Sequence, residues 1–134
     1  MARTVKISKA SKELTKVEKI ALQDTSDCLS IDKVVGDCLA ENKQCIITPK
    51  DFVLLNIHND TPKQGGSEDY ITLVVIDRNG NKYATGSTSF AEAFLNIWDG
   101  MHEDEDDPVY SIRVLRRDSN NYKGKYFLTC GIVA

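Results

Sequence analysis

The sequence predicts a mainly β protein, a five-stranded barrel with the element order β-β-β-α-β-β and an N-terminal helical extension. Two observations predict it: residues 44–134 carry β-rich runs separated by polar turns, and one helical segment lies between the third and fourth of these runs. The length of 134 residues suits one domain with one sizeable core. We therefore assign residues 1–43 to a basic arm and helical extension, and residues 44–134 to the barrel.

Residues 1–43 show helical rather than strand spacing. Leu14, Val17 and Ala21 recur at intervals typical of a short helix, with a partly ordered arm as the alternative. A second helix is predicted to start after Ser30 as its N-cap and to end near Asn42, although a glycine in its middle weakens it. Its predicted apolar side is made of Ile31, Val34, Val35, Cys38 and Leu39.

The barrel begins with two β-rich runs at residues 45–48 and 50–57. Pro49 between them has no N–H for a strand ladder, so it is expected at an edge, a bulge or a break. Residues 58–69 are rich in polar residues and glycine, and this composition predicts a long loop.

A tight hairpin is predicted next, from the β runs 70–77 and 82–87 around Asn79-Gly80. Such a pair is typical of a type I′ turn, in which both central residues have positive φ. After it, Ser89 and Glu92 fit a capping box at the start of a helix of about ten residues that ends near Gly100. The core face of this helix is predicted to consist of Phe90, Phe94, Ile97, Trp98 and Met101.

The last segment opens with five consecutive acidic residues, 103–107, which predict a solvated loop. Two strands follow, at 109–116 and 125–133, joined by a polar, basic loop at 117–125. The order from residue 44 onward matches the OB-fold, whose helix lies between its third and fourth strands. An α+β sandwich uses the same order and stays open as an alternative.

Net charge alone argues mildly against a nucleic-acid partner, since 17 basic and 20 acidic residues give -3. The charge is nevertheless divided along the chain: +4 over residues 1–20, -6 over 21–102, -5 over 103–107 and +4 over 108–134. The second positive segment contains aromatic residues and includes the loop between the last two strands, one of the two loops that border the ligand in an OB-fold. Basic side chains that follow phosphates and aromatic faces that stack on bases are what single-stranded nucleic acid needs. Solubilising charges and core-packed aromatic rings are the competing interpretation. The candidate binding residues here are Arg113, Arg116, Arg117, Tyr122, Lys123, Lys125, Tyr126 and Phe127.

Residues 76–87, 90–97 and 121–130 together resemble single-stranded DNA-binding proteins of bacteriophages of Gram-positive bacteria, including the small protein-primed phages. The resemblance covers about two thirds of the chain. It implies a protein that coats displaced single strands during phage DNA replication, in the host cytoplasm, with single-stranded DNA as its partner and replication proteins as further partners. By position it implicates Tyr83, Tyr122, Lys123, Lys125 and Phe127, and Lys82 beside Tyr83 completes the predicted site.

No signature of catalysis or cofactor binding occurs in the sequence. Phosphate-binding glycine loops, the nucleophile elbow and the His-Glu-x-x-His zinc motif are all absent, so we expect no enzyme and no cofactor. The four cysteines form no Cys-x-x-Cys pair, which predicts small hydrophobic residues rather than metal ligands. No apolar run reaches the roughly 20 residues of a membrane span, and the basic N-terminus lacks the apolar block of a secretory signal. The alternative function is a non-enzymatic protein-interaction domain that uses the barrel edge or the N-terminal helices.

Overall fold

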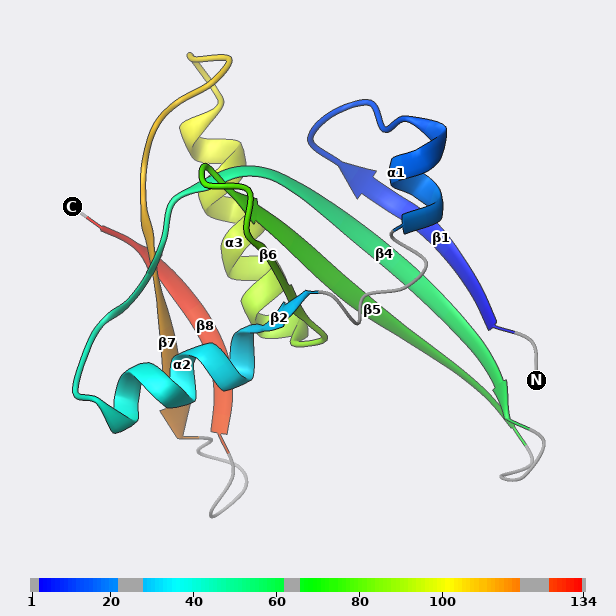
Figure 1. Ribbon diagram of the computed structural model, residues 1–134, viewed down its shortest axis with the longest axis horizontal. Helices are drawn as coiled ribbons and strands as arrows, with labels where there is room; N and C mark the ends of the chain where they lie inside the picture. Colours follow the sequence, from blue (N-terminus) through cyan, green and yellow to red (C-terminus); the bar gives the residue numbers. More distant parts are fainter. Residues whose placement is uncertain (1–2, 22–27, 62–65, 119–125, 134) are drawn as a thin grey trace.

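The computed structural model describes residues 3–21, 28–61, 66–118 and 126–133. The fold is mainly β, with the elements arranged as in Figure 1. In chain order they are β1 (Arg3–Ala10), α1 (Lys16–Ala21), β2 (Leu29–Ser30), α2 (Ile31–Ala40), β3 (Cys45–Ile47), β4 (Pro49–Thr61), β5 (Gly66–Asp77), β6 (Lys82–Thr85), α3 (Thr88–Met101), β7 (Ile112–Asp118) and β8 (Tyr126–Ile132).

The strands form two open sheets, so the predicted five-stranded barrel is not closed. One sheet has the order β1-β4-β5-β6-β2 and the other the order β3-β7-β8. The two sheets meet where β3 runs into β4, and the pairing register of β4 shifts between Pro49 and Asp51, which confirms a bulge at the proline. Within the described residues β6 and β8 are not paired. Instead, helix α3 packs against β8, and the Ser89 hydroxyl donates a 2.6 Å hydrogen bond to the carbonyl oxygen of Leu128 in β8.

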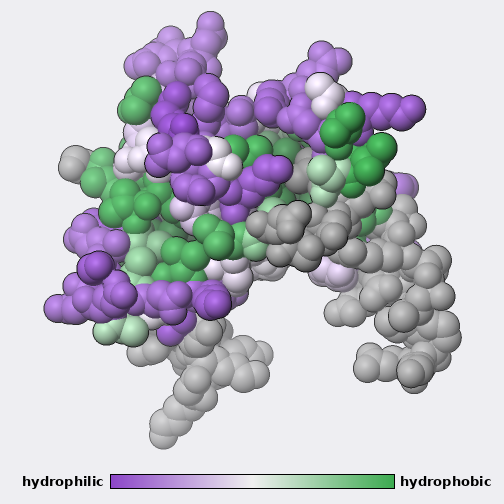
Figure 2. Space-filling view, viewed as in Figure 1, coloured by the Kyte–Doolittle hydropathy of each residue, from purple (hydrophilic) through white to green (hydrophobic). Residues whose placement is uncertain are grey.

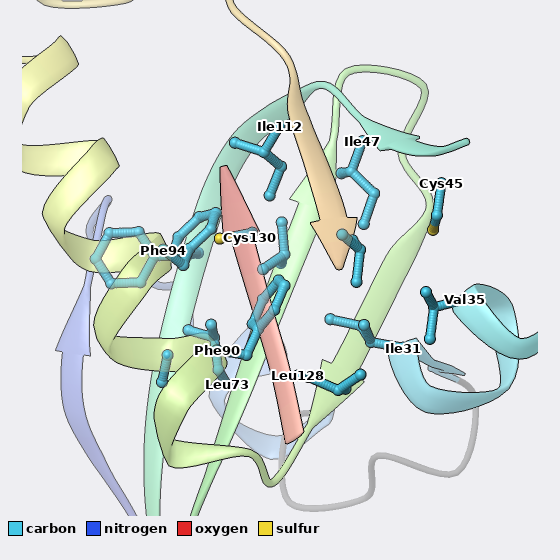
Figure 3. Close-up of a cluster of buried hydrophobic side chains, with 14 of the residues drawn as sticks. Ile31, Val35, Cys45, Ile47, Leu73, Phe90, Phe94, Ile112, Leu128 and Cys130 are labelled. Carbon is cyan, nitrogen blue, oxygen red and sulfur yellow. The ribbon is translucent and has the colours of Figure 1, made fainter. Parts of the chain in front are cut away.

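The main core lies between the two sheets, α2 and α3. Figure 3 shows Phe90 and Phe94 of α3 on one side of this core and Ile31 and Val35 of α2 on another. The Phe52 ring of β4 meets α3 edge-on, with its centroid 5.7 Å from that of Phe94 and 4.9 Å from that of Trp98. The aromatic side of α3 is thus a core face, as its spacing predicts.

A second, smaller core covers the opposite face of β4 and β5. Side chains alternate along a strand, so Val53, Leu55 and Ile57 point away from the main core; with Val74 of β5 they are buried against Leu14. β1 pairs with β4 along its length in an antiparallel register. The first 43 residues, predicted as a helical extension, therefore also contribute two strands to the larger sheet, and the predicted short helix is present as α1.

The polar segment 58–69 is mostly strand, so the predicted long loop is wrong. β4 continues to Thr61 and β5 begins at Gly66, with His58 directly opposite Asp69. Their side chains form a cross-strand contact of 2.6 Å between His58 Nδ1 and Asp69 Oδ1. The backbone ladder extends from the apolar part of the hairpin into the polar part, and this local pairing outweighs the loop-like composition. In Figure 1 the β4–β5 hairpin extends beyond the helices as a long arm.

The hairpin between β5 and β6 is confirmed, but its turn is not type I′. Gly80 has φ of 89°, whereas Asn79 does not have positive φ, since Asn42 is the single non-glycine residue with positive φ in the described part of the chain. The Gly80 N–H donates to the Asp77 carbonyl at 3.1 Å, and the Asp77 carboxylate accepts the N–H groups of Asn79 and Asn81, each at 2.9 Å. The turn is therefore stabilised by hydrogen bonds to the buried Asp77 carboxylate, and not by a second residue with positive φ as in a type I′ turn.

Helix α2 has the ends that the sequence predicts. The Ser30 side chain accepts the N–H of Lys33, and Asn42 has φ of 58° just after the last turn. Helix α3 differs, because its N-cap is Ser87, whose hydroxyl accepts the Phe90 N–H at 3.2 Å. The hydroxyl of Ser89 is bonded to β8 and is not available as a cap.

Candidate nucleic-acid interface

The two faces of β7 have different chemistry. Ile112 and Val114 are buried in the main core, so the alternating residues Arg113, Leu115 and Arg117 lie on the opposite face. The pairing with β8 places Gly131 opposite Arg113, Thr129 opposite Leu115, and Phe127 opposite Arg117. β3 adds Ile46 beside Arg113 on the other side. We call this the Arg–Phe face, made of Ile46, Arg113, Leu115, Arg117, Phe127 and Thr129.

Large apolar side chains on the Arg–Phe face reach solvent. Phe127 is 40% exposed and Ile46 is 43% exposed. Directly paired residues on one face of an antiparallel sheet have Cβ atoms about 5 Å apart, so the side chains of Arg117 and Phe127 start from neighbouring positions on this face. In Figure 2 hydrophobic residues gather over the region where Figure 1 draws β7 and β8, with hydrophilic residues above and below.

The arginines of this face are not neutralised by the residues that the structure describes. Neither Arg113 nor Arg117 has an ion pair or a side-chain hydrogen bond to another described residue. Arg78 shows the contrast: its Nη2 atom donates to Asp107 Oδ1 at 2.8 Å and to the Pro108 carbonyl at 3.0 Å. The Arg78 guanidinium lowers the pKa of the Asp107 carboxyl from its ordinary value. One carboxylate of the acidic run is therefore already engaged, whereas Arg113 and Arg117 have no such partner among the described residues.

Three other candidates lie elsewhere. Arg116 is on the core side of β7, where it pairs with the buried Leu128, and its guanidinium reaches α2 at Gly36. Tyr83 is partly buried against the main core and its hydroxyl donates to Asp77 Oδ2 at 3.3 Å; burial first, and then the Asp77 charge, raise its pKa. Lys82 is exposed but belongs to β6 in the other sheet. Arg113, Arg117 and Phe127 thus lie on one face. Arg116 and Lys82 do not lie on it, and Tyr83 meets it only at its edge, where it lines a polar pocket together with Ile46.

The remaining candidates fall outside what the structure describes. Tyr122, Lys123 and Lys125 lie in segment 119–125, which is not described. Tyr126 is placed as the first residue of β8, opposite Asp118, but its side chain is not described. In the sequence, segment 119–125 connects β7 to β8.

A pocket beside the Arg–Phe face was not predicted from the sequence. It has a volume of about 220 Å³ and lies between α2, β3 and β7. The sequence pattern assigned Leu39 to the core side of its helix, but this side chain is 54% exposed at the pocket. We call this the α2 pocket; it is lined by Val35, Cys38, Leu39, Lys43, Gln44, Cys45, Arg113, Val114 and Leu115.

A polar pocket of about 330 Å³ lies on the β4–β5 arm and is lined by Lys6, Asn56, His58 and Asp69. The 2.6 Å His58–Asp69 contact orients the imidazole, as in a catalytic dyad. The described residues that line the pocket include no serine, threonine or cysteine that such a dyad could activate.

The cysteines are free thiols. Cys45 and Cys130 are buried, and burial raises the pKa of each to about 12, with Cys38 adding to the effect at Cys45. Such thiols are poor nucleophiles at neutral pH. Among the described residues no group of three or more His, Cys, Asp and Glu side chains is arranged to hold a metal ion. Within the same residues no helix has both the length and the hydrophobicity to cross a membrane.

Comparison with known proteins identifies no relative. No protein family, no curated protein and no solved structure matches the chain.

Proposed function

We propose that the protein binds single-stranded DNA on the Arg–Phe face without strong sequence preference and without catalysis. The observation that carries the proposal is the cross-strand pair of Arg117 and the exposed Phe127, with Arg113 on the same face of β7. An exposed aromatic ring stacks on any base, and each stacked base contributes about 1–3 kcal/mol. The backbone positions of Arg113 and Arg117 are about 13 Å apart along the strand, since each residue advances it by about 3.3 Å. Arg117 then contacts a phosphate beside the base stacked on Phe127, and Arg113 contacts one farther along the bound strand.

Charge supports the same face. Arg113 and Arg117 lie on this face, and the strands β3, β7 and β8 contain a single acidic residue, Asp118, at the end of β7. In the sequence, segment 119–125 between β7 and β8 adds Lys123 and Lys125, and an aromatic residue in Tyr122. A protein with net charge -3 thereby presents one locally cationic and aromatic surface.

The strand order supports an OB-type relationship, which forms part of the proposal. Counting β3 and β4 as one bent strand, the pairing runs β6-β5-β4/β3-β7-β8, and α3 lies between β6 and β7 in the chain. An OB barrel has this succession when it is open between its third and fifth strands. The β4–β5 face opposite the main core is covered by the second core, whereas Phe127 and Ile46 of the Arg–Phe face are exposed.

The role that follows is protection of displaced single strands during DNA replication, in the cytoplasm of a bacterial host, as the resemblance to phage proteins implies. Replication proteins are the further partners that such a role calls for. The competing function, a protein-interaction domain, gives the opposite result in the experiment below.

The test is fluorescence anisotropy of labelled oligo-dT at about 50 mM and about 200 mM salt. Phe127→Ala is expected to weaken binding about five-fold or more through lost stacking. Arg113→Ala and Arg117→Ala are each expected to lower the salt dependence of the affinity by about 0.7 in logarithmic slope. Lys33→Ala, an exposed lysine change on α2, is the matched control and should bind as the wild type does.

The possible results of this experiment distinguish single-strand binding from the assignment of its site. Absence of wild-type binding at the lower salt overturns single-strand binding and favours a protein partner. Wild-type binding that survives all three face substitutions refutes the site but not the function. Oligo-U beside oligo-dT distinguishes a DNA preference from general single-strand binding.

A further inference from the structure

The α2 pocket opens beside the Arg–Phe face, and the inference below rests on the proposed function. Arg113 and Leu115 belong to both the pocket wall and the face. A strand that lies across β7 therefore passes the mouth of the pocket. No sequence pattern pointed to this site, because the residues that form it come from three separate elements.

The size of the pocket suits a small ring system. Its volume of about 220 Å³ is well above the roughly 30 Å³ that one water molecule occupies in the liquid. It is below the roughly 300–1,000 Å³ typical of sites for drug-sized ligands. One planar heteroaromatic group fits this range better than a longer ligand.

The chemistry of the pocket suits an uncharged ring attached to an anion. Its walls are mainly apolar, with Leu39 and Leu115 on opposite elements. Gln44 adds an amide that can donate and accept hydrogen bonds at a base edge. The cations Arg113 and Lys43 also line it, and Lys43 forms an exposed 3.1 Å ion pair with Glu41 that a phosphate can compete with. A nucleotide combines the ring and the negative charge that this lining selects.

We propose that the α2 pocket receives one nucleobase of the DNA strand bound on the Arg–Phe face. The base enters between Leu39 and Leu115, while its flanking phosphates contact Arg113 and Lys43. The stacked base on Phe127 and the inserted base then fix the strand at two points across β7. Because insertion buries a base face in an apolar site, the pocket tolerates different bases. Hydrogen bonds to the Gln44 amide make its affinity differ from one base to another.

Cys38 provides a reporter for the inserted base. It lines the pocket and is partly exposed, whereas Cys45 beside it is buried. Cys28 is also partly exposed but packs on the second core, so it is the matched internal control. Modification of each cysteine by an aromatic disulfide reagent can be followed by mass spectrometry of its peptide.

The experiment compares saturating oligo-dT with an oligonucleotide of the same length in which every nucleotide is abasic. Oligo-dT is expected to slow Cys38 modification about five-fold or more, with the abasic strand giving little protection and Cys28 unaffected by both. Leu39→Ala, a change at an exposed position, is expected to weaken oligo-dT binding and to leave abasic binding as in the wild type. Val17→Ala, at a 76% exposed position on α1, serves as its control.

Equal protection of Cys38 by the two strands means that the backbone covers the pocket, and it overturns the inference while the proposed function stands. Unchanged oligo-dT affinity of Leu39→Ala also overturns the inference. If Cys38 does not react in the free protein, this affinity measurement is the deciding test. Failure of the wild type to bind any oligonucleotide in the anisotropy measurement instead removes the proposed function.

Discussion

The Nη2 atom of Arg116 lies 3.1 Å from the position that a Cβ atom at Gly36 would occupy. The glycine weakens the middle of α2, yet its lack of a side chain lets the guanidinium of β7 approach the helix. The Nε atom of Arg116 is fully buried, so the side chain is confined between the strand and the helix. A helix-weakening residue is thus explained by the packing of a cation against it.

A double-mutant cycle tests this relationship. Alanine is favoured over glycine in a helix interior by about 1 kcal/mol. We expect Gly36→Ala to raise the free energy of unfolding by about that amount in an Arg116→Ala background. In the wild type we expect no gain, because the new methyl group must displace the confined guanidinium. Urea denaturation of the four proteins measures the coupling, and equal gains in both backgrounds would contradict the close approach.

Asp77 is the second position where one side chain organises its surroundings. Its carboxylate accepts from the N–H groups of Asn79 and Asn81, from the Asn81 side chain at 3.1 Å and from the Tyr83 hydroxyl at 3.3 Å. Burial alone would raise its pKa, but these hydrogen bonds together outweigh burial and lower it below 3.8. We expect Asp77→Asn to cost about 2 kcal/mol at pH 7, because an amide nitrogen then faces donors.

The pH dependence of that cost has a defined sign. A carboxyl group with a lowered folded-state pKa contributes stability above its unfolded value of 3.8, and this is lost as the pH falls through the folded-state pKa. The stability difference between the wild type and Asp77→Asn should therefore shrink as urea denaturation is repeated at falling pH below 3.8. Asp106→Asn, in the exposed acidic run, is the control and should change little at any pH.

Local patterns predicted most of the elements but not how they join. The 3.6-residue spacing of Phe90, Phe94 and Trp98 predicted a core helix, because burial on one side is a property of the helix alone. The composition of residues 58–69 predicted a loop, because strand pairing there depends on a partner five to eleven residues away rather than on local propensity. The pairing of β1 with β4 was invisible for the same reason.

The candidate site was predictable to a similar extent. Alternation in a recognised strand places Arg113 and Arg117 on one face and Arg116 on the other, once the buried side of β7 is known. A count of charges could not distinguish the two arginines on this face from Arg116, because it does not say to which face of the strand a side chain points. The hydrogen bond from Tyr83 to the Asp77 carboxylate was not predictable, because it is set by the turn geometry rather than by composition.

The two serines at the start of α3 have different tasks and should respond differently to aspartate. Ser87 accepts the Phe90 N–H as the N-cap, so Ser87→Ala is expected to cost about 1 kcal/mol and Ser87→Asp to restore stability, since aspartate also caps well. Ser89 donates to the Leu128 carbonyl, so Ser89→Asp should be more destabilising than Ser89→Ala because it turns a carboxylate toward an oxygen. Thermal unfolding of the four variants measures this, and a stabilising Ser89→Asp would instead favour Ser89 as the cap.

Cys130 predicts how stability responds to alkaline pH. Burial raises its pKa from 9.0 to about 12, so the folded state holds its proton in a range where the unfolded chain releases it. A group with a raised folded-state pKa contributes fully below the unfolded value and loses its contribution as the pH rises toward the folded value. Between pH 9 and 12 the wild type should therefore lose about 1.4 kcal/mol of unfolding free energy per pH unit through this thiol.

Cys130→Ala lacks this loss, although its cavity lowers stability at neutral pH. The stability difference between the two proteins should be constant up to pH 9 and then narrow, as measured by urea denaturation at successive pH values. A difference that stays constant up to pH 11 would show that the thiol ionises as readily in the folded protein as in the unfolded chain.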